Sequence, residues 1–264
     1  MARFARAPIG RLLFTALLFG VVCGAVISWF ATTCIAPVVD EAVDKLPTTG
    51  LIKRGVLNWP EPNGRLLAAN AFTSLEVRIG EMNQDSAPVD FAFEFGTNSV
   101  VLRSLLGIHE FRYSARYTVE VNRPALRPAW GAWRAPILFG LIPGAALALL
   151  LSWSVLATVY AIPVLTLGKL LARDLTFWRT WKMCVAAQLP GSLIITFGLA
   201  LYSTGQIAVV FVFVMFVGHF VSTLLYLLLS PMFLPRAERT AGGENPFESE
   251  PAKKPRKKNP FGAK

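Results

Sequence analysis

Three long stretches of the chain contain no Asp, Glu, Lys or Arg: residues 12–39, 135–168 and 183–235. A water-soluble fold rarely contains such runs, because one face of each of its elements must meet water. About 20 mainly apolar residues are enough for a helix to cross a bilayer. The pattern therefore predicts an α-helical polytopic membrane protein and excludes a soluble enzyme.

The third stretch is too long for one crossing, since a single helix of that length would measure roughly 80 Å. The polar cluster Tyr202-Ser203-Thr204-Gly205-Gln206 interrupts it and is typical of a turn. The first stretch follows three arginines, as a signal peptide would, but its apolar core exceeds the usual 7–15 residues of such a peptide. We therefore expect four retained transmembrane helices, at residues 12–35, 135–168, 184–202 and 207–234, with an outer turn at 203–206.

The segment between the first two helices, residues 36–134, shows the alternation of β-strands. Leu75, Val77 and Ile79 alternate with Glu76 and Arg78, and residues 89–95 and 117–121 repeat the pattern. We predict a small, mainly antiparallel β domain with one packed face and one wet face that carries the charged residues. Its start, Asp40–Lys45, either continues the first helix or forms a short amphipathic turn.

The net charge of +10 lies entirely on three segments. Residues 1–11, 169–183 and 235–264 together carry 15 basic and 5 acidic residues, whereas residues 40–134 carry 11 of each. Since Lys and Arg mark cytoplasmic loops, both termini and the 169–183 loop are predicted to be cytoplasmic. The β domain is then extracytoplasmic. It contains no glycosylation sequon, which favours a bacterial cytoplasmic (inner) membrane.

The 169–183 loop combines aromatic and basic residues at helical spacing. This pattern is typical of a segment that lies in the membrane interface, with its cations near anionic headgroups. The residues expected to contact the lipid surface there are Arg173, Trp178, Arg179, Trp181 and Lys182.

The tail, residues 235–264, is rich in Pro, Gly, Glu and Lys, and we predict that it is disordered. Its basic cluster is expected to bind anionic lipids at the cytoplasmic face, because it lies next to the membrane. Nucleic-acid binding is not expected, because it would need a supporting fold or interleaved aromatics. The tripeptide Asn-Pro-Phe occurs twice, which favours a docking peptide similar to ligands of EH domains. The residues concerned are Lys253, Lys254, Arg256, Lys257 and Lys258 for lipid, and Asn245, Pro246, Phe247, Asn259, Pro260 and Phe261 for docking.

Polar and helix-breaking residues within the helices are the remaining candidates for function. His219 with Gln188 forms a candidate intramembrane polar site, either structural or involved in proton or ligand handling. The pairs Pro143-Gly144 and Pro190-Gly191 are expected to break or kink two helices near their starts.

A row of small residues on the first helix, Gly20, Gly24 and Ser28, favours close helix packing, within the chain or in a homo-oligomer.

No catalytic, cofactor-binding or metal-binding set is evident in the sequence. His109 stands alone in the outer domain and is interpreted as a surface or edge-strand residue. Cys23, Cys34 and Cys184 lie in or beside helices, as small buried residues do. The sequence therefore predicts neither an enzyme nor a cofactor.

Leu175–Gly198 resembles the inner loop and following helix of YIP-like membrane proteins and their bacterial relatives, in which a basic amphipathic segment leads into a helix with an early proline. The layout of a helix, an outer β-rich insert and further helices is also similar. This resemblance implies a membrane-organising or accessory role and supplies no catalytic residues.

Two functions follow as expectations. The first is a non-enzymatic accessory or scaffold protein that recruits a protein partner through its tail or outer domain. The alternative is a small transporter or lipid-handling protein that uses the bundle of helices two to four.

Overall fold

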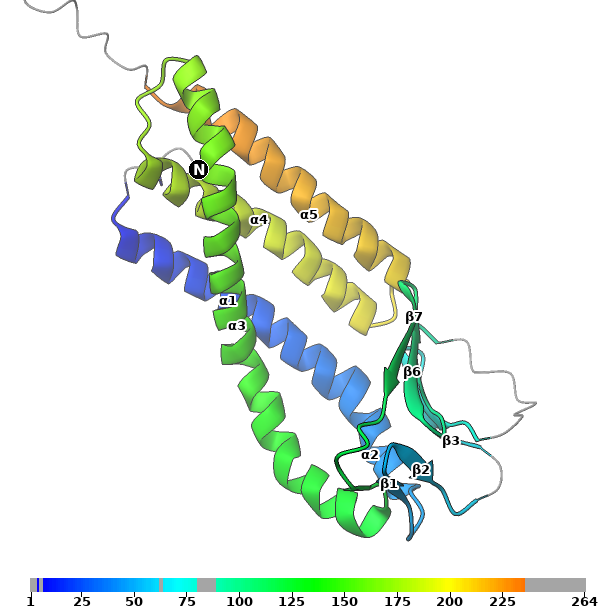
Figure 1. The fold of residues 1–264 in the computed structure, drawn as a ribbon. Coiled ribbons are helices and arrows are strands. Elements are labelled where there is room, and N and C mark those ends of the chain that lie inside the picture. The colour runs from blue at the N-terminus through cyan, green and yellow to red at the C-terminus, as the bar shows by residue number, and fades with distance from the viewer. Residues whose placement is uncertain (1–3, 5–6, 62–63, 80–88, 236–264) are drawn as a thin grey trace, which may run out of the picture.

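The computed structural model describes Phe4 and residues 7–61, 64–79 and 89–235. Four helices in this part of the chain are long and apolar enough to cross a membrane. Two small sheets lie between the first and second of them. The predicted fold class is therefore confirmed, and Figure 1 shows the helices side by side with the strands at one end of the bundle.

The first helix is longer than its predicted span. α1 (Ile9–Phe30) passes through a π-helical turn, Ala31–Ile35, into α2 (Ala36–Asp44), so the first of the two alternatives for Asp40–Lys45 is confirmed. A π-turn displaces the usual backbone hydrogen bonds. Here Asn70 Nδ2 donates to the carbonyl of Cys34 at 2.6 Å, which ties the helix to the β domain.

α3 (Arg123–Leu170) has 48 residues and begins well before the expected start at residue 135. Its first turn is capped by Asn122, whose side chain accepts from the amide of Ala125 at 3.0 Å. At 1.5 Å per residue it measures roughly 70 Å, more than twice the hydrocarbon thickness. Both ends of the segment predicted as a β domain are thus helical, and we use "β domain" below for residues 45–122.

α2 and the projecting start of α3 form a stalk between the membrane helices and the β domain. Asp40 joins them: Trp130 Nε1 donates to its Oδ1 at 2.6 Å, and Arg134 lies 3.0 Å from its Oδ2. Arg123 and Arg127 pair with Asp44 in the same way, at 3.6 and 3.4 Å. The stalk therefore holds the two helices together beyond the apolar span.

α4 (Phe177–Ser203) occupies the centre of the bundle and packs on α1, α3 and α5 (Val209–Leu229). α5 packs mainly on α4, leaves most of its apolar side chains exposed, and ends in a 3-10 turn, Ser230–Phe233. Figure 1 places the start of α1, the α3–α4 connection and the end of α5 at the bundle end opposite the strands.

The row of small residues on α1 packs against α3. A Cβ atom on Gly20 would lie 3.2 Å from the Cα of Ala146, and one on Gly24 would lie 2.6 Å from the carbonyl oxygen of Ile142. Ser28 Oγ donates to the carbonyl of Leu138 at 3.0 Å. The alternative of packing within the chain is therefore confirmed.

The β domain consists of two sheets. The smaller has the order β2-β1-β8, and the larger has the order β3-β4-β5-β6-β7. All pairs are antiparallel except β4 with β5. The strands are β1 (Leu51–Lys53), β2 (Val56–Asn58), β3 (Arg65–Ala69), β4 (Thr73–Val77), β5 (Phe91–Phe95), β6 (Ser99–Ser104), β7 (Gly107–Arg112) and β8 (Val119–Glu120).

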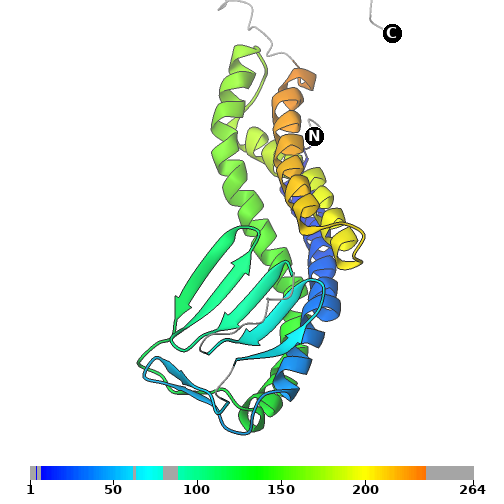
Figure 2. The same cartoon turned by 90° about the vertical axis from the view of Figure 1, so that its right-hand side faces the viewer.

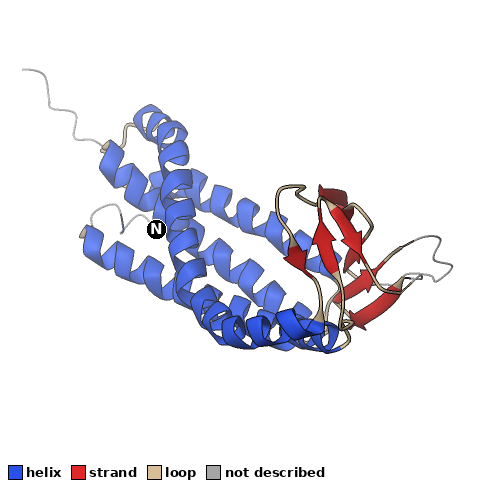
Figure 3. Cartoon of the chain, turned by 60° about the horizontal axis from the view of Figure 1, so that its bottom comes forward, coloured by secondary structure: helices blue, strands red, loops and turns tan. Residues whose placement is uncertain are grey.

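The domain core lies between these two sheets and the stalk. Buried side chains from α2, β2, β3 and β4 form one apolar cluster, and Leu126 of α3 packs against it. Figures 2 and 3 show the larger sheet packed beside the helices at one end of the bundle.

Candidate functional site

The core of the β domain contains a cavity of about 370 Å³. Every strand except β7, together with α2, the start of α3 and the loops between them, contributes to its wall. Its lining residues are Val39, Ala42, Val43, Leu46, Ile52, Leu57, Leu67, Leu75, Val77, Phe95, Val100, Tyr113, Val119, Val121 and Leu126. We call this space the domain cavity.

Tyr113 carries the one polar side chain in the wall of the domain cavity. Its hydroxyl donates to the carbonyl of Gly96 at 3.1 Å, and burial raises its pKa to about 12. The hydroxyl is therefore neutral and already satisfied. The wall offers a ligand apolar surface and no free polar group.

A second hollow, of about 280 Å³, lies between the domain cavity and the end of α1, which belongs to the first candidate membrane span. Val39 and Leu75 line both spaces, so the two are neighbours. The second hollow reaches Phe30, the last residue of α1. We call it the membrane-side hollow.

Thr73 is the one polar residue that lines the membrane-side hollow. It is 4% exposed, and its Oγ1 has no hydrogen-bond partner among the described residues. A buried hydroxyl without a partner costs free energy. It could donate to an acceptor on a bound molecule, such as an ester carbonyl.

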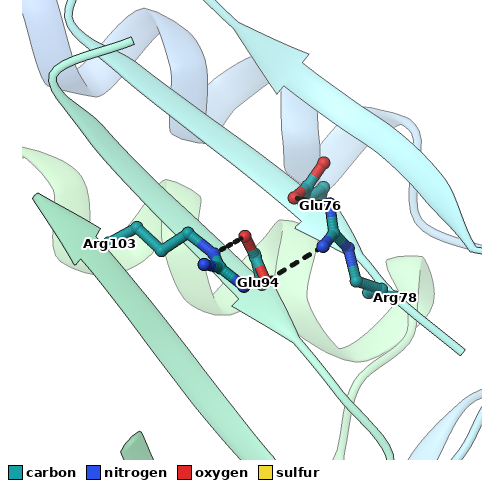
Figure 4. Close-up of polar contacts among 4 residues, drawn as sticks. All are labelled: Glu76, Arg78, Glu94 and Arg103. Atoms are coloured by element: carbon teal, nitrogen blue, oxygen red, sulfur yellow. Dashed lines mark hydrogen bonds and ion pairs between the residues drawn. The ribbon is translucent and has the colours of Figure 1, made fainter. Parts of the chain in front are cut away.

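The opposite face of the larger sheet holds a cluster of charges (Figure 4). Glu76 and Glu94 lie directly opposite each other on the parallel strands β4 and β5, and each is 3% exposed. Arg78 lies 3.3 Å from Glu76 Oε1 and 3.6 Å from Glu94 Oε2, and Arg103 Nε on β6 donates to Glu94 Oε1. The cluster therefore links three adjacent strands.

Burial raises the pKa of Glu76, and the adjacent Glu94 raises it further, while Arg78 and Arg103 oppose the shift. The interpretation of these carboxylates as members of a solvated face is wrong for both glutamates. Residues on the same face, Arg78 and Arg103, cover them. His109, by contrast, is exposed on the edge strand β7, as expected.

Among the described residues, no hydrogen bond joins Gln188 to His219. Gln188 is buried and donates from Nε2 to the carbonyl of Trp153 on α3, at 3.0 Å, and to that of Cys184. His219 instead packs on Gly191 of α4, where an added Cβ atom would lie 2.5 Å from its Nδ1. The two candidates thus face different helices.

The two proline–glycine pairs lie inside continuous helices. Pro143 stands near the middle of α3, and Pro190 near the middle of α4. Neither pair ends its helix or lies near a helix start, so the alternative of a break near the start is wrong, while the alternative of a kink stays a prediction. Gly191 serves as the close contact with His219, while a Cβ atom on Gly144 would have no neighbour within 4 Å.

The amphipathic 169–183 loop is only partly helical, because residues 171–176 form a non-helical connection and α4 begins at Phe177. Several of its expected lipid contacts have partners within the chain. Arg173 donates to the carbonyl of Leu234, Arg179 pairs with Asp174, and Lys182 donates to the carbonyl of Ala7 at 2.7 Å.

The tryptophans of this segment differ in their surroundings. Trp178 is 64% exposed, whereas Trp181 Nε1 bonds Thr158 Oγ1 at 3.1 Å. The basic cluster and both Asn-Pro-Phe motifs of the tail lie outside the described residues.

Comparison with protein-family models, curated proteins and solved structures finds no match in any of the three. The resemblance of Leu175–Gly198 to YIP-like membrane proteins therefore stays an expectation.

The residues of the two hollows were not singled out from the sequence. The alternation of apolar and polar residues along β4 and β5 was visible in the sequence, but it predicted only that one face of the sheet is packed, and not that this face lines a cavity. The parallel pairing of these strands, and the helical stalk that closes the space, depend on contacts between distant segments.

Proposed function

We propose that this polytopic membrane protein is a non-enzymatic lipid-handling protein that binds the acyl chain of a bilayer lipid in its β domain. The observation that carries this proposal is the domain cavity, whose wall is apolar except for the Tyr113 hydroxyl, which already donates to the carbonyl of Gly96. It develops the lipid-handling alternative, but places the site in the β domain instead of the helix bundle.

The size and chemistry of the cavity favour an acyl chain over a water-soluble ligand. Its volume of about 370 Å³ lies within the 300–1,000 Å³ range of small-molecule pockets. Such pockets normally orient a polar ligand with a few well-placed polar groups. The domain cavity has none free, whereas a hydrocarbon chain needs only burial.

The neighbouring hollow gives the lipid a plausible orientation. Its chain end would occupy the domain cavity, its ester carbonyl would accept from Thr73 Oγ1, and its headgroup would stay near the membrane surface. With the termini cytoplasmic, as the charge distribution predicts, the lipid would come from the outer leaflet of a bacterial cytoplasmic membrane.

A pair of tryptophan substitutions on β2 tests the proposal. Leu57 is 4% exposed and lines the domain cavity, whereas Val56, its neighbour on the opposite face of the strand, is 39% exposed. The full-length chain is reconstituted in phosphatidylcholine vesicles that contain a phosphatidylcholine with a photoreactive diazirine in its acyl chain. After illumination, labelled peptides are identified by mass spectrometry.

We expect the wild type and Val56→Trp to be labelled on cavity-lining residues such as Val43 and Tyr113. Leu57→Trp should lose most of this label, because the indole occupies the space. Absence of cavity label in the wild type, or equal label in both variants, would contradict the proposal.

The accessory or scaffold role rests on the tail, which lies outside the described residues. It stays a hypothesis, with the test that deletion of residues 237–264 abolishes partner recruitment and leaves folding intact.

A further inference from the structure

A third apolar hollow lies where the β domain meets the membrane helices. It measures about 290 Å³, and its wall combines the turn between β6 and β7 with residues of α4 and α5. Phe91, at the start of β5, lines both this space and the membrane-side hollow. The three hollows therefore follow one another from α5 to the interior of the β domain, and we call this third one the side hollow.

The turn that covers the side hollow has an unusual composition. β6 and β7 are joined by only two residues, Leu105 and Leu106, since Ser104 pairs with Gly107. Such turns normally carry Asn, Asp or Gly. Leu105 is 55% exposed and Leu106 is 75% exposed. The turn therefore presents apolar side chains that the fold itself does not bury.

The position of the turn accounts for this composition. Leu105 and Leu106 share the side hollow with Val209, Phe213 and Phe216, which cover the first two turns of α5. α5 is a candidate membrane span whose mean hydropathy is 2.2. In Figures 1 and 2 this end of the larger sheet reaches the level at which α5 begins. The two leucines thus lie beside the first turns of this candidate span.

We propose that the Leu105–Leu106 turn is inserted in the bilayer, and that lipid acyl chains enter the β domain sideways there, between this turn and α5, passing Phe91. The inference rests on the proposed lipid-handling function and adds the entry route. A lateral route spares the chain from crossing water, where exposed methylene groups are unfavourable.

A lysine in the turn provides a direct test. Leu106→Lys places a charge in the wall of the side hollow, whereas Ile108→Lys places the same charge on β7, at a position that is 63% exposed and paired with Arg103. Both sites are exposed in the protein, so neither lysine needs to be buried for the domain to fold. Both variants are examined with the photoreactive phosphatidylcholine in phosphatidylcholine vesicles.

We expect Leu106→Lys to lower labelling of the domain cavity roughly tenfold or more, because a charge in hydrocarbon is strongly unfavourable. Ile108→Lys should be labelled as the wild type is. Equal cavity labelling in all three proteins would overturn the route and leave the acyl-binding function standing. No cavity label in the wild type would overturn both.

The wild type supplies a second readout that needs no substitution. Its label should also map to the side hollow, at Phe91, Leu105 or Phe213. It should be absent from Ala115, an exposed turn residue that lies next to Gly55 of the β1–β2 turn and lines none of the three hollows. Cavity label without any label in the side hollow would contradict lateral entry even if Leu106→Lys failed to fold.

Discussion

At the scale of single residues, the two faces of β4 carry opposite chemistries one residue apart. Thr73, Leu75 and Val77 face the apolar spaces, while Ser74 and Glu76 lie on the face with the charge cluster. Each face contains a buried polar group with a testable property: the Thr73 hydroxyl has no hydrogen-bond partner among the described residues, and the pKa of Glu76 is raised by burial. These groups give the two predictions that follow.

The first concerns Thr73, whose buried hydroxyl has no partner among the described residues. Thr73→Val keeps the shape and removes the donor, so lipid retention should fall about fivefold, the equivalent of roughly 1 kcal/mol. The unfolding temperature should stay the same or rise. Photolabelling and thermal unfolding of the same sample measure both effects.

Ser74→Ala is the matched control, because Ser74 is also buried and unpartnered in the described part of the chain, but lies on the opposite face. This variant should change neither the amount of photolabel nor the residues that carry it. A loss of label in both variants would indicate a general weakening of the sheet instead of a hydroxyl that binds lipid.

The second prediction concerns Glu76, whose pKa is raised by burial and by Glu94. A raised pKa means that the folded state holds the proton more tightly than the unfolded state does. The resulting stabilisation is full below the unfolded pKa, near 4.5, and is lost as the pH rises through the folded value. The β domain should therefore become less stable as the pH rises from about 4.5 through the folded pKa of Glu76.

Thermal unfolding of the detergent-solubilised chain between about pH 4 and 8 tests this pH dependence. Glu76→Gln should flatten the curve and raise the unfolding temperature at neutral pH by a few degrees. Glu110→Gln, which removes an exposed carboxylate on β7, should leave the wild-type curve unchanged. A wild-type curve that rises with pH would show that another group dominates.

At the scale of elements, the helices were predictable because an apolar run is a local signal. The ends of the helices were less predictable. The first turns of α3 contain charged residues and prolines, so a search for stretches without charged residues does not include them. The Asn122 cap with a proline in the first turn was nevertheless a readable start signal. The charge cluster was missed because the alternation that places Glu76 and Arg78 on one face does not reveal that Glu94 and Arg103 join them.

The contact between α1 and α3 leads to a prediction at this scale. A methyl group on Gly24 would meet the backbone of Ile142 at 2.6 Å, whereas one on Gly144 would meet nothing within 4 Å. Gly24→Ala should destabilise the bundle by about 1–3 kcal/mol, because the backbone of Ile142 cannot move away from the added methyl group without strain. Gly144→Ala should be neutral or slightly stabilising, because alanine favours a helix.

Unfolding in a denaturing detergent mixture, followed by circular dichroism, compares the two variants. If Gly144→Ala lowered the stability of the bundle as much as Gly24→Ala does, side-chain packing could not be the reason, and the Pro143-Gly144 pair would have another structural role. If neither mattered, the close α1–α3 contact would not contribute to stability.

At the scale of the whole molecule, several contacts fix the β domain to the membrane bundle. They include the stalk of α2 and α3 and the hydrogen bond from Asn70 to the carbonyl of Cys34. At the end of α4, Tyr202 donates to Asp90 at 2.7 Å and packs its ring 4.9 Å from that of Phe72. No local sequence pattern predicts the contacts of Tyr202, because they join segments more than 100 residues apart. Together these contacts hold the apolar hollows next to the ends of the membrane helices α1 and α5.

The side of the membrane on which the β domain lies decides which leaflet supplies the lipid. Ala115 and Ala172 are exposed alanines in turns at opposite ends of the molecule, and the native cysteines are free and buried. A cysteine at each position can therefore be labelled selectively with a membrane-impermeant maleimide on intact cells. Since the basic residues concentrate at the Ala172 end, Ala115→Cys should be labelled on intact cells and Ala172→Cys only after permeabilisation. The reverse result would place the hollows against the cytoplasmic leaflet, and the side hollow would then collect inner-leaflet lipid by the same lateral route.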